Sequence, residues 1–376
     1  MISILSVFPP YRGGIATFSD YLYRNLDDIT DVNAYNFSYL YPSFLFPGKS
    51  QFTEDDAAGN YAKRIFHSCN PFNWKKTARQ ILEDNPDHVI LCYWHPFFAL
   101  ALLKVMNEIK KQRPKLPVHV LAHNVVPHES FPLGHRLSKA LLDKADTLIL
   151  LSEKSCDEAK KIGVSSTIIK LFHPVYEQKK PIQSRNSLRN AFGYSNKDKV
   201  FLFFGLVRPY KGLDLFIEAL NTLDLEKHHI RPLIVGEFYT DKEPILSKIK
   251  DTHRGFYTID DRFVSEEEMA ELFTLSDALV MPYRSASQSG ILANAINFHL
   301  PSIVTNLKGL TEHIEHQKTA WVVEKEDVKD LSKAILSLTD PNQLKEIKAA
   351  LIPLKEQLSW KMFTKQLITE ISEEIS

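Results

Sequence analysis

The chain has 376 residues, of which 44% are hydrophobic and 24% are charged. This composition is typical of a globular protein and excludes a disordered or collagen-like chain. At roughly 150 residues per domain, the length predicts two domains. The chain has 46 Lys+Arg and 46 Asp+Glu, so it carries no net charge. This balance argues against a nucleic-acid partner, because such binders are usually basic.

The three cysteines form no closely spaced pair, which argues against a disulfide framework and structural zinc and suits a reducing compartment. Residues Met1–Phe8 lack the basic start of a secretory signal. The longest apolar stretch, Val89–Leu103, is broken by a His-Pro pair and is shorter than the ~20 residues of a membrane-spanning helix. We expect a cytoplasmic protein that does not span a membrane.

The first half of the chain alternates short apolar runs with amphipathic segments. Near-continuous apolar runs are typical of strands that are buried on both faces of a parallel sheet. The expected strands are Ile2–Phe8, Val32–Tyr41, Val89–Tyr93, Val118–His123, Thr147–Ser152 and Thr167–Phe172. The expected helices are Ala16–Leu26, Trp74–Glu83, Phe97–Lys111 and Arg136–Lys144. This alternation predicts a doubly wound α/β domain.

A polar, turn-rich segment, Glu177–Asn196, interrupts the pattern, and we expect one linker near residue 178. A second series then begins. Its expected strands are Val200–Phe204, Pro232–Gly236, Gly255–Ile259, Ala278–Pro282, Pro301–Thr305 and Ala320–Glu324, and its expected helices are Gly212–Leu223, Ser265–Leu275, Gly290–Phe298 and Val328–Leu338. The predicted domains are residues 1–177 and 178–358. Residues 359–376 form an amphipathic helix that either caps the second domain or returns to the first.

Three glycine-containing loops between a strand and a helix are candidate ligand sites, because open parallel sheets bind ligands at the carboxyl ends of their strands. The first contains Gly13 and Gly14. Adjacent glycines allow a ligand to approach the backbone closely, although a plain turn explains them equally well. The GxGxxG pattern of a dinucleotide site is missing here, so we do not expect a nicotinamide cofactor.

The second loop, Gly205 to Gly212, carries Arg208 and Lys211. A guanidinium group forks onto phosphate oxygens and an ammonium group adds a compact charge. The pair is therefore suited to a diphosphate. A solvated basic turn is the alternative.

The third loop ends in Ser289, Gly290 and Ile291, where a helix begins. Free backbone N–H groups at the start of a helix attract anions, whereas a serine there can simply cap the helix. Asn294 lies one turn further along the same face and is a candidate partner for a ribose hydroxyl.

Taken together, these loops resemble those of the family-4 retaining glycosyltransferases with the glycosyltransferase B (GT-B) fold. The resemblance covers most of the chain. It rests on the Gly13-Gly14 loop, the Arg208-x-x-Lys211-Gly element, Val235-Gly236, the block Pro301–Glu312 and Ser359-Trp360. It implies two Rossmann-like doubly wound domains that face each other across a cleft, with the acceptor bound by the first domain and the nucleotide sugar by the second.

One feature departs from the family pattern. The family usually has two glutamates, with seven residues between them, in the loop and helix where this chain has Ala286 and Asn294. Because Ala286 stands at the position of the first glutamate, any role that this glutamate has near the donor sugar in the family is in doubt for this chain. It also makes the expected ribose contact an amide.

The resemblance implies a hexosyltransferase-like enzyme that transfers a sugar from a UDP- or GDP-linked donor to a saccharide or lipid-linked acceptor, with retention at the anomeric carbon. Surface polysaccharide biosynthesis is the implied context. Arg208 and Lys211 would stabilise the leaving diphosphate. The chain has no Asp-x-Asp motif, so we expect no metal site and no cofactor. Oligomeric state is not predicted.

Further candidate site residues come from the resemblance and from the ends of other strands. His123, at the end of a buried strand, matches the histidine that lines the sugar site in this family, and core packing is the alternative. Glu312 is a candidate donor contact or a structural carboxylate. Tyr93, Trp94 and His95 end another strand and are candidates for acceptor binding, with packing under a loop equally open. His128 is a weaker candidate than His123.

Two other functions remain open. A nucleotide-sugar epimerase of the same fold would need acid–base carboxylates near the sugar, and no convincing pair appears in these loops. A catalytically silent sugar-nucleotide-binding protein is motivated by Ala286 and Asn294.

Peripheral contact with the inner face of the membrane is suggested by the basic cluster Lys110–Lys115 and by the aromatics of Tyr39–Pro47, but a solvated helix end and a packed loop are the simpler explanation.

Overall fold

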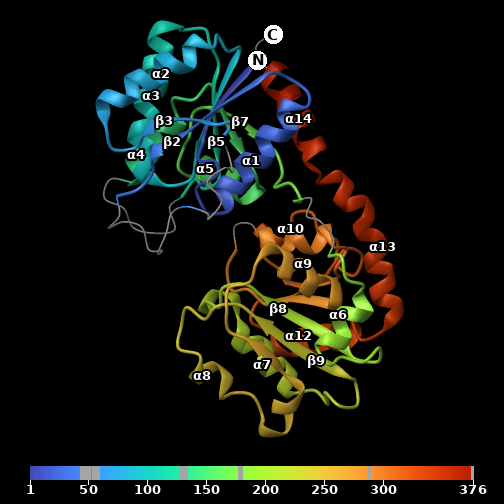
Figure 1. The fold of residues 1–376 in the computed structure, drawn as a ribbon. Coiled ribbons are helices and arrows are strands. Elements are labelled where there is room, and N and C mark those ends of the chain that lie inside the picture. Colours follow the sequence, from blue (N-terminus) through green and yellow to red (C-terminus); the bar gives the residue numbers. More distant parts are fainter. Residues whose placement is uncertain (43–51, 53–59, 127–133, 177–180, 287–288, 374–376) are drawn as a thin grey trace. The chain divides into compact units, whose positions relative to one another are not determined.

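The computed structural model describes residues 1–42, 52, 60–126, 134–176, 181–286 and 289–373. The chain forms two compact units (Figure 1). Met1–Phe172 and Trp360–Ser376 make the first unit, and His173–Ser359 makes the second. The boundary expected between residues 177 and 178 lies outside the described residues.

The first unit contains a seven-stranded parallel sheet with the order β3-β2-β1-β4-β5-β6-β7. Its strands are β1 (Ile2–Leu5), β2 (Val32–Tyr39), β3 (Lys63–His67), β4 (His88–Tyr93), β5 (Val118–Ala122), β6 (Thr147–Leu150) and β7 (Thr167–Lys170). The central strands are almost completely buried because helices cover both faces of the sheet.

The helices of this unit are α1 (Gly14–Asp27), α2 (Pro71–Glu83), the 3-10 turn η2 (Pro96–Phe98), α3 (Ala99–Gln112), α4 (Gly134–Leu142), α5 (Glu153–Lys161) and α14 (Trp360–Glu373). On one face α3 packs against both α2 and α4, and on the other α14 packs against α1 (Figure 1). Trp360 anchors α14, because its buried ring contacts Phe18 and stacks on Tyr21. The last helix of the chain thus belongs to the core of the first unit.

The second unit contains a six-stranded parallel sheet with the order β10-β9-β8-β11-β12-β13. Its strands are β8 (Lys199–Phe204), β9 (Ile230–Val235), β10 (Thr258–Asp260), β11 (Ala278–Met281), β12 (Ser302–Thr305) and β13 (Trp321–Val323). The strand order reverses between β8 and β11. In open α/β sheets the crevice for a ligand lies at such a reversal, outside the carboxyl ends of the strands.

The helices of the second unit are α6 (Arg185–Ala191), η3 (Pro209–Lys211), α7 (Leu213–Asn221), α8 (Glu243–Leu246), η4 (Asp251–Phe256), α9 (Glu266–Leu275), α10 (Gly290–Asn297), α11 (Lys308–Thr311), α12 (Val328–Ser337) and α13 (Pro341–Gln357). On one side of the sheet α7 packs against α12. On the other, α6 packs against α9 and α10 packs against α13 (Figure 1).

The prediction of two doubly wound parallel α/β sheets is confirmed. The linker expected near residue 178 lies outside the described residues, but the polar segment after it, where no helix was expected, contains α6. Ser184 caps this helix by accepting a hydrogen bond from the backbone N–H of Ser187. The polar sequence hides the helix because its buried face includes Arg189, which is 3% exposed and is paired with Asp277.

Candidate functional site

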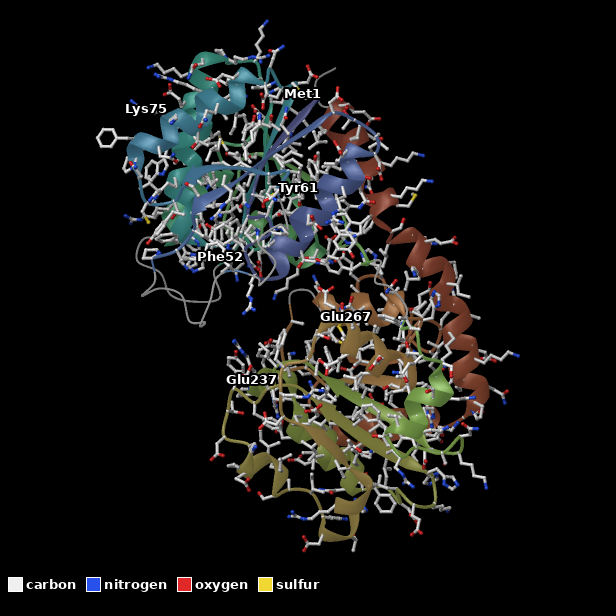
Figure 2. The ribbon with its side chains drawn as sticks, viewed as in Figure 1. Met1, Phe52, Tyr61, Lys75, Glu237 and Glu267 are labelled. Carbon is white, nitrogen blue, oxygen red and sulfur yellow. The ribbon has the colours of Figure 1, made fainter. Side chains whose placement is uncertain are left out.

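The two loops predicted to bind a diphosphate lie at the same place in the second sheet. One follows β8 and the other follows β11, and these parallel strands are neighbours at the reversal of strand order. Glu237, labelled in Figure 2, follows β9 at the same carboxyl edge. The strand order therefore places both predicted loops beside the ligand crevice of a doubly wound sheet.

Gly205 is the point at which these loops converge. It has a positive φ of 90°. A β-carbon built on it would lie 2.9 Å from Nζ of Lys211 and 2.9 Å from Cδ1 of Ile291. A side chain at this position would collide with both residues. The structure thus brings together Gly205, Lys211 and Ile291, all of which the sequence assigned to the donor site.

Lys211 is a nearly buried cation, with only 6% of its surface exposed. Its ammonium group forms no hydrogen bond or ion pair with any residue that the structure describes, and it lies 5.7 Å from the ring centre of Tyr283. Burial, together with the positive charge of Arg208, lowers the pKa of Lys211 to about 8. A buried charge without a counter-charge is costly to the fold, so an anion bound here would be strongly favoured.

Arg208 lies on the exposed side of the same loop. Its guanidinium group sits over the ring of Tyr239, 5.1 Å from the ring centre. Within the described part of the chain it pairs with no carboxylate. The positive charge of Arg208 lowers the pKa of Lys211, so the two cations are close enough to interact electrostatically. Arg208 is thus held by an aromatic face and remains available to an anion.

Arg284, which the sequence analysis did not select, braces the loop that carries Lys211. Its Nη1 donates to the carbonyl oxygen of Pro209 at 2.8 Å, and its backbone N–H donates to Tyr210 at 2.6 Å. Both terminal nitrogens bind the carboxylate of Asp214, at 2.9 and 2.7 Å, and Nε binds Glu326 at 3.0 Å. This one side chain ties together the loops that follow β8, β11 and β13.

Gly212 sets the close approach of the same two loops. Its φ is +69°, and a β-carbon on it would lie 2.1 Å from the carbonyl oxygen of Pro282. Any larger residue would push the loop after β8 away from the loop after β11. Arg284 lies two residues after Pro282, and Asp214 lies in the first turn of α7, two residues after Gly212.

The helix that follows the third loop begins with a capping serine, which was the simpler alternative to an anion site. Ser289 is the N-cap of α10, and its Oγ accepts a hydrogen bond from the backbone N–H of Leu292 at 3.3 Å. The backbone N–H groups of Gly290 and Ile291 have no partner among the described residues. These groups, at the positive end of the helix dipole, are suited to an anion. Ser287 and Gln288 lie outside the described residues.

Asn294 faces α9 in this structure. Its Nδ2 contacts Sδ of Met269 at 3.5 Å, and its buried Oδ1 has no hydrogen-bond partner among the described residues. Glu312 ends the short helix α11, which follows β12, the neighbour of β11. Both residues therefore belong to the same edge of the sheet as Lys211.

In the first unit the predicted residues also gather at a reversal of strand order, between β1 and β4. Gly13 is the N-cap of α1 with a φ of +117°, and a β-carbon on Gly13 or Gly14 would meet nothing within 4 Å. His123 directly follows β5 and is 9% exposed. Its ring packs edge-on against Phe18 at 4.7 Å between ring centres. His128 lies outside the described residues.

The acceptor prediction needs a correction at Tyr93. This residue is 1% exposed, and its hydroxyl lies 2.5 Å from Oγ of Ser138. Tyr93 is therefore a core residue, whose ring cannot stack on a sugar. Trp94 and His95 are partly exposed at the end of β4. The indole N–H of Trp94 donates to the hydroxyl of Tyr41, and Nδ1 of His95 accepts from the backbone N–H of Phe97.

The remaining predictions concern metals and membranes. Within the described ranges, no group of three or more His, Cys, Asp or Glu side chains is placed to hold a metal ion. No helix in those ranges has the length and hydrophobicity needed to cross a membrane. In the basic cluster, Lys110 forms an ion pair with Asp146 at 2.5 Å. Phe44 and Phe46 of the aromatic segment lie outside the described residues.

Residues 198–340 match the family model described as "Glycosyl transferases group 1". Among curated proteins, the chain is 23% identical over 288 residues to the N-acetyl-alpha-D-glucosaminyl L-malate synthase of Bacillus anthracis, covering 67% of this chain and 72% of that protein. It is also 23% identical over 232 residues to the D-inositol 3-phosphate glycosyltransferase of Streptomyces bingchenggensis, covering 58% of this chain and 51% of that protein.

Among solved structures, Alr3699/HepE of Anabaena in complex with UDP superposes with a TM-score of 0.74 at 14% identity, covering 99% of both chains. A glycosyltransferase from Rickettsia africae superposes with a TM-score of 0.73 at 16% identity, covering 100% of this chain and 98% of that chain. These two likenesses extend over the whole fold, whereas the family model matches the part of the chain that carries Arg208, Lys211 and α10.

Proposed function

We propose that the chain is a group 1 glycosyltransferase, which transfers a sugar from a nucleoside-diphosphate donor to a saccharide or lipid-linked acceptor with retention at the anomeric carbon. The match of residues 198–340 to that family model and the GT-B fold support this proposal. The diphosphate binds in the second unit between Arg208, Lys211 and the first turn of α10. The first unit supplies the acceptor side, with Trp94 and His95 as candidate contacts, and Gly13 and Gly14 are further candidates for donor binding.

A single observation supports this assignment most strongly. Lys211 is 6% exposed and has no carboxylate partner among the described residues. It lies against Gly205, beside the side chain of Ile291. A nearly buried, uncompensated ammonium next to unpartnered backbone N–H groups is suited to a compact polyanion, and a diphosphate is such a ligand.

The chemistry follows from where charge develops. When the bond between the sugar and the diphosphate breaks, negative charge grows on the leaving phosphate oxygens. Lys211 and Arg208 would stabilise that charge, and Lys211 would do so in a site from which water is largely excluded. The brace of Arg284 holds Lys211 in position before the substrate binds, so little reorganisation is needed. His123 remains the candidate for a contact with the donor sugar.

These cations also lead us to propose that transfer needs no divalent metal ion. They would supply at the leaving group the positive charge that a metal supplies elsewhere. Incubation with EDTA should leave the transfer rate unchanged. Complete loss of activity in EDTA, restored by added Mg²⁺ or Mn²⁺, would contradict this part of the proposal.

The solved structures guide our choice of the nucleotide base of the donor. HepE was crystallised with UDP and with UDP-glucose, so we propose a UDP-linked sugar as the first donor to test and GDP-linked sugars as the comparison. Asn294 would contact the ribose through its unpartnered Oδ1, and Glu312 would complete the donor side. Cytoplasmic assembly of a surface polysaccharide is the context that we propose for this activity.

A binding and turnover experiment tests the function. Thermal-shift titrations with UDP, GDP and their glucose and N-acetylglucosamine conjugates should raise the melting temperature with one base, because a bound ligand stabilises the fold by mass action. The stabilising conjugate is then incubated without an acceptor, and slow release of the nucleoside diphosphate is expected. An epimerised sugar, or tight binding with no release at any acceptor concentration, would reject transfer.

A further inference from the structure

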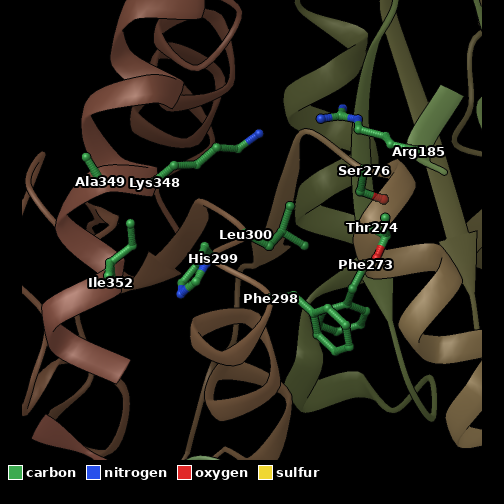
Figure 3. A pocket seen from close by; sticks show the side chains of 10 residues that line it. All are labelled: Arg185, Phe273, Thr274, Ser276, Phe298, His299, Leu300, Lys348, Ala349 and Ile352. Atoms are coloured by element: carbon green, nitrogen blue, oxygen red, sulfur yellow. The ribbon is translucent and has the colours of Figure 1, made fainter. Parts of the chain in front are cut away.

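A second site lies at the other edge of the second sheet. A cavity of about 390 Å³ opens there, lined by residues that precede β11 and β12, such as Ser276 and Leu300, and by residues of α6 and α13 (Figure 3). These are the amino ends of strands whose carboxyl ends carry the donor loops. The cavity is therefore separate from the site of Lys211.

Two cations face each other in this cavity. Figure 3 shows the ammonium group of Lys348 and the guanidinium group of Arg185 pointing toward one another. The ammonium group of Lys348 forms no hydrogen bond or ion pair with any described residue. Burial and the charge of Arg185 are the two main causes that lower the pKa of Lys348. Like charges held together in this way favour an anion between them.

The neighbouring carboxylate does not neutralise the cavity. Asp277 binds Arg185 at 2.7 Å and Arg189 at 3.0 Å, so one carboxylate already serves two guanidinium groups. Lys199 adds a further positive charge that acts on Lys348. The positive charges around the cavity therefore outnumber the one carboxylate that faces them.

The remaining wall is apolar. Lys348 and Ile352 are four residues apart on α13 and share one face of that helix. Phe298 and Leu300 line the cavity from the segment between α10 and β12. Figure 3 shows Ile352 and Phe298 extending beside the cavity below the two cations. The site thus offers a charged end and an apolar end to one small ligand.

We propose that this cavity binds a small organic phosphate, with the phosphate group between Arg185 and Lys348 and its organic part against Phe298, Leu300 and Ile352. Its volume is suited to a compact ligand, since small-molecule sites usually measure about 300–1,000 Å³. The site is independent of the donor site, and the proposal does not depend on which nucleotide the enzyme uses.

Phenyl phosphate is a suitable probe, because it joins a phosphate group to one apolar ring. Its binding to the full chain is followed by broadening of its ³¹P resonance. We expect it to bind the wild type more tightly than inorganic phosphate does, because of the apolar wall. Lys348→Met should weaken phenyl phosphate binding by about tenfold or more, through loss of a charge-assisted contact. Lys211→Met, which alters the donor site, should leave it unchanged.

Two further variants complete the test. Lys345→Met removes an exposed charge from the same helix and should leave binding unchanged. Ala349→Trp adds bulk to the cavity wall and should abolish binding without removing a charge. The proposal is rejected if phenyl phosphate does not bind the wild type, or binds it no more tightly than inorganic phosphate does. It is also rejected if Lys348→Met and Ala349→Trp both bind phenyl phosphate as tightly as the wild type, or if Lys211→Met no longer binds it.

Discussion

The terminal nitrogen of Lys211 lies 2.9 Å from the point that a β-carbon on Gly205 would occupy. The glycine and the lysine come from opposite ends of one loop, so the loop folds its cation back over its own beginning. Ile291, from the first turn of α10, closes on the same point. The absence of a side chain at residue 205 is thus part of the geometry of the predicted diphosphate site.

Gly205→Ala tests that geometry. The new methyl group would displace Lys211 or Ile291, and the nucleoside diphosphate that binds the wild type should bind about tenfold or more weakly, as expected for loss of one charge-assisted contact. Titration calorimetry measures the change. Gly193→Ala is the matched control, because Gly193 also has a positive φ of 73° but no atom within 4 Å of its built β-carbon.

Both variants should lose about 1 kcal/mol of unfolding free energy from the left-handed backbone, but only Gly205→Ala should lose affinity. Equal affinities for the two variants would show that the space at Gly205 is not used by the ligand.

Nucleotide binding should weaken as the pH rises. Because the pKa of Lys211 is lowered to about 8, the free enzyme loses this charge between roughly pH 7 and pH 9.5, whereas an ordinary lysine keeps it. Lys211→Arg keeps its charge throughout and should bind with an affinity that varies little over this range. Parallel pH profiles for the two proteins would contradict the assignment.

The same shift has a consequence for stability. The folded-state pKa of Lys211 lies below its unfolded value of about 10.5, so the unfolded chain binds the extra proton between these two values. The contribution of Lys211 to the free energy of unfolding should therefore rise with pH across this window. Urea titrations of the wild type and Lys211→Met measure it as the pH dependence of the difference between them.

Arg284→Met tests the brace between the loops. The substitution removes the two bonds to Asp214, the bond to the Pro209 carbonyl and the bond to Glu326, and leaves the partly buried carboxylate of Asp214 with only the more distant Lys248, at 4.0 Å, among its described ion-pair partners. We expect the unfolding free energy to fall by about 1–3 kcal/mol and nucleotide affinity to fall with it. Arg254→Met, which breaks an exposed pair with Asp251, should change stability by less than about 1 kcal/mol. Full nucleotide affinity in Arg284→Met would exclude a positioning role.

Tyr93→Phe tests whether Tyr93, at the end of β4, is a core residue and not an acceptor contact. Loss of the hydroxyl leaves Oγ of Ser138 without this partner, so the unfolding free energy should fall by about 1 kcal/mol. The KM for the acceptor should stay unchanged, because Tyr93 is 1% exposed. Trp94→Phe is the comparison, since Trp94 is partly exposed. A rise in acceptor KM for Tyr93→Phe with no loss of stability would restore Tyr93 to the acceptor site.

Much of the fold was predictable because buried parallel strands leave an uninterrupted apolar signal. β5 shows this best, since all of its residues are buried. The edge strand β3 was missed because it begins with two exposed cations, Lys63 and Arg64. The polar helix α6 was missed because its buried face contains Arg189, whose charge is compensated by Asp277, a residue 88 positions away.

The site was predictable where glycines and cations form local patterns, as at Gly205, Arg208 and Lys211. Arg284 was not selected because its role depends on Asp214 and on two backbone carbonyls of another loop, and a single sequence does not show such distances. The prediction that Tyr93 binds the acceptor was wrong because the sequence does not show whether an aromatic residue at a strand end faces the ligand or the core. Burial alone decides between the two.

The most direct test of the account is the dissociation constant of the nucleoside diphosphate for the wild type and for Lys211→Met, measured by titration calorimetry near pH 7. Loss of the charge should weaken binding by about 1.5–3 kcal/mol. The unfolding free energy without ligand should stay equal or rise, because an uncompensated buried ammonium is removed. Lys318→Met, which removes an exposed lysine paired with Glu315, should leave binding unchanged. Equal dissociation constants for the wild type and Lys211→Met would contradict the assignment of the diphosphate to this loop.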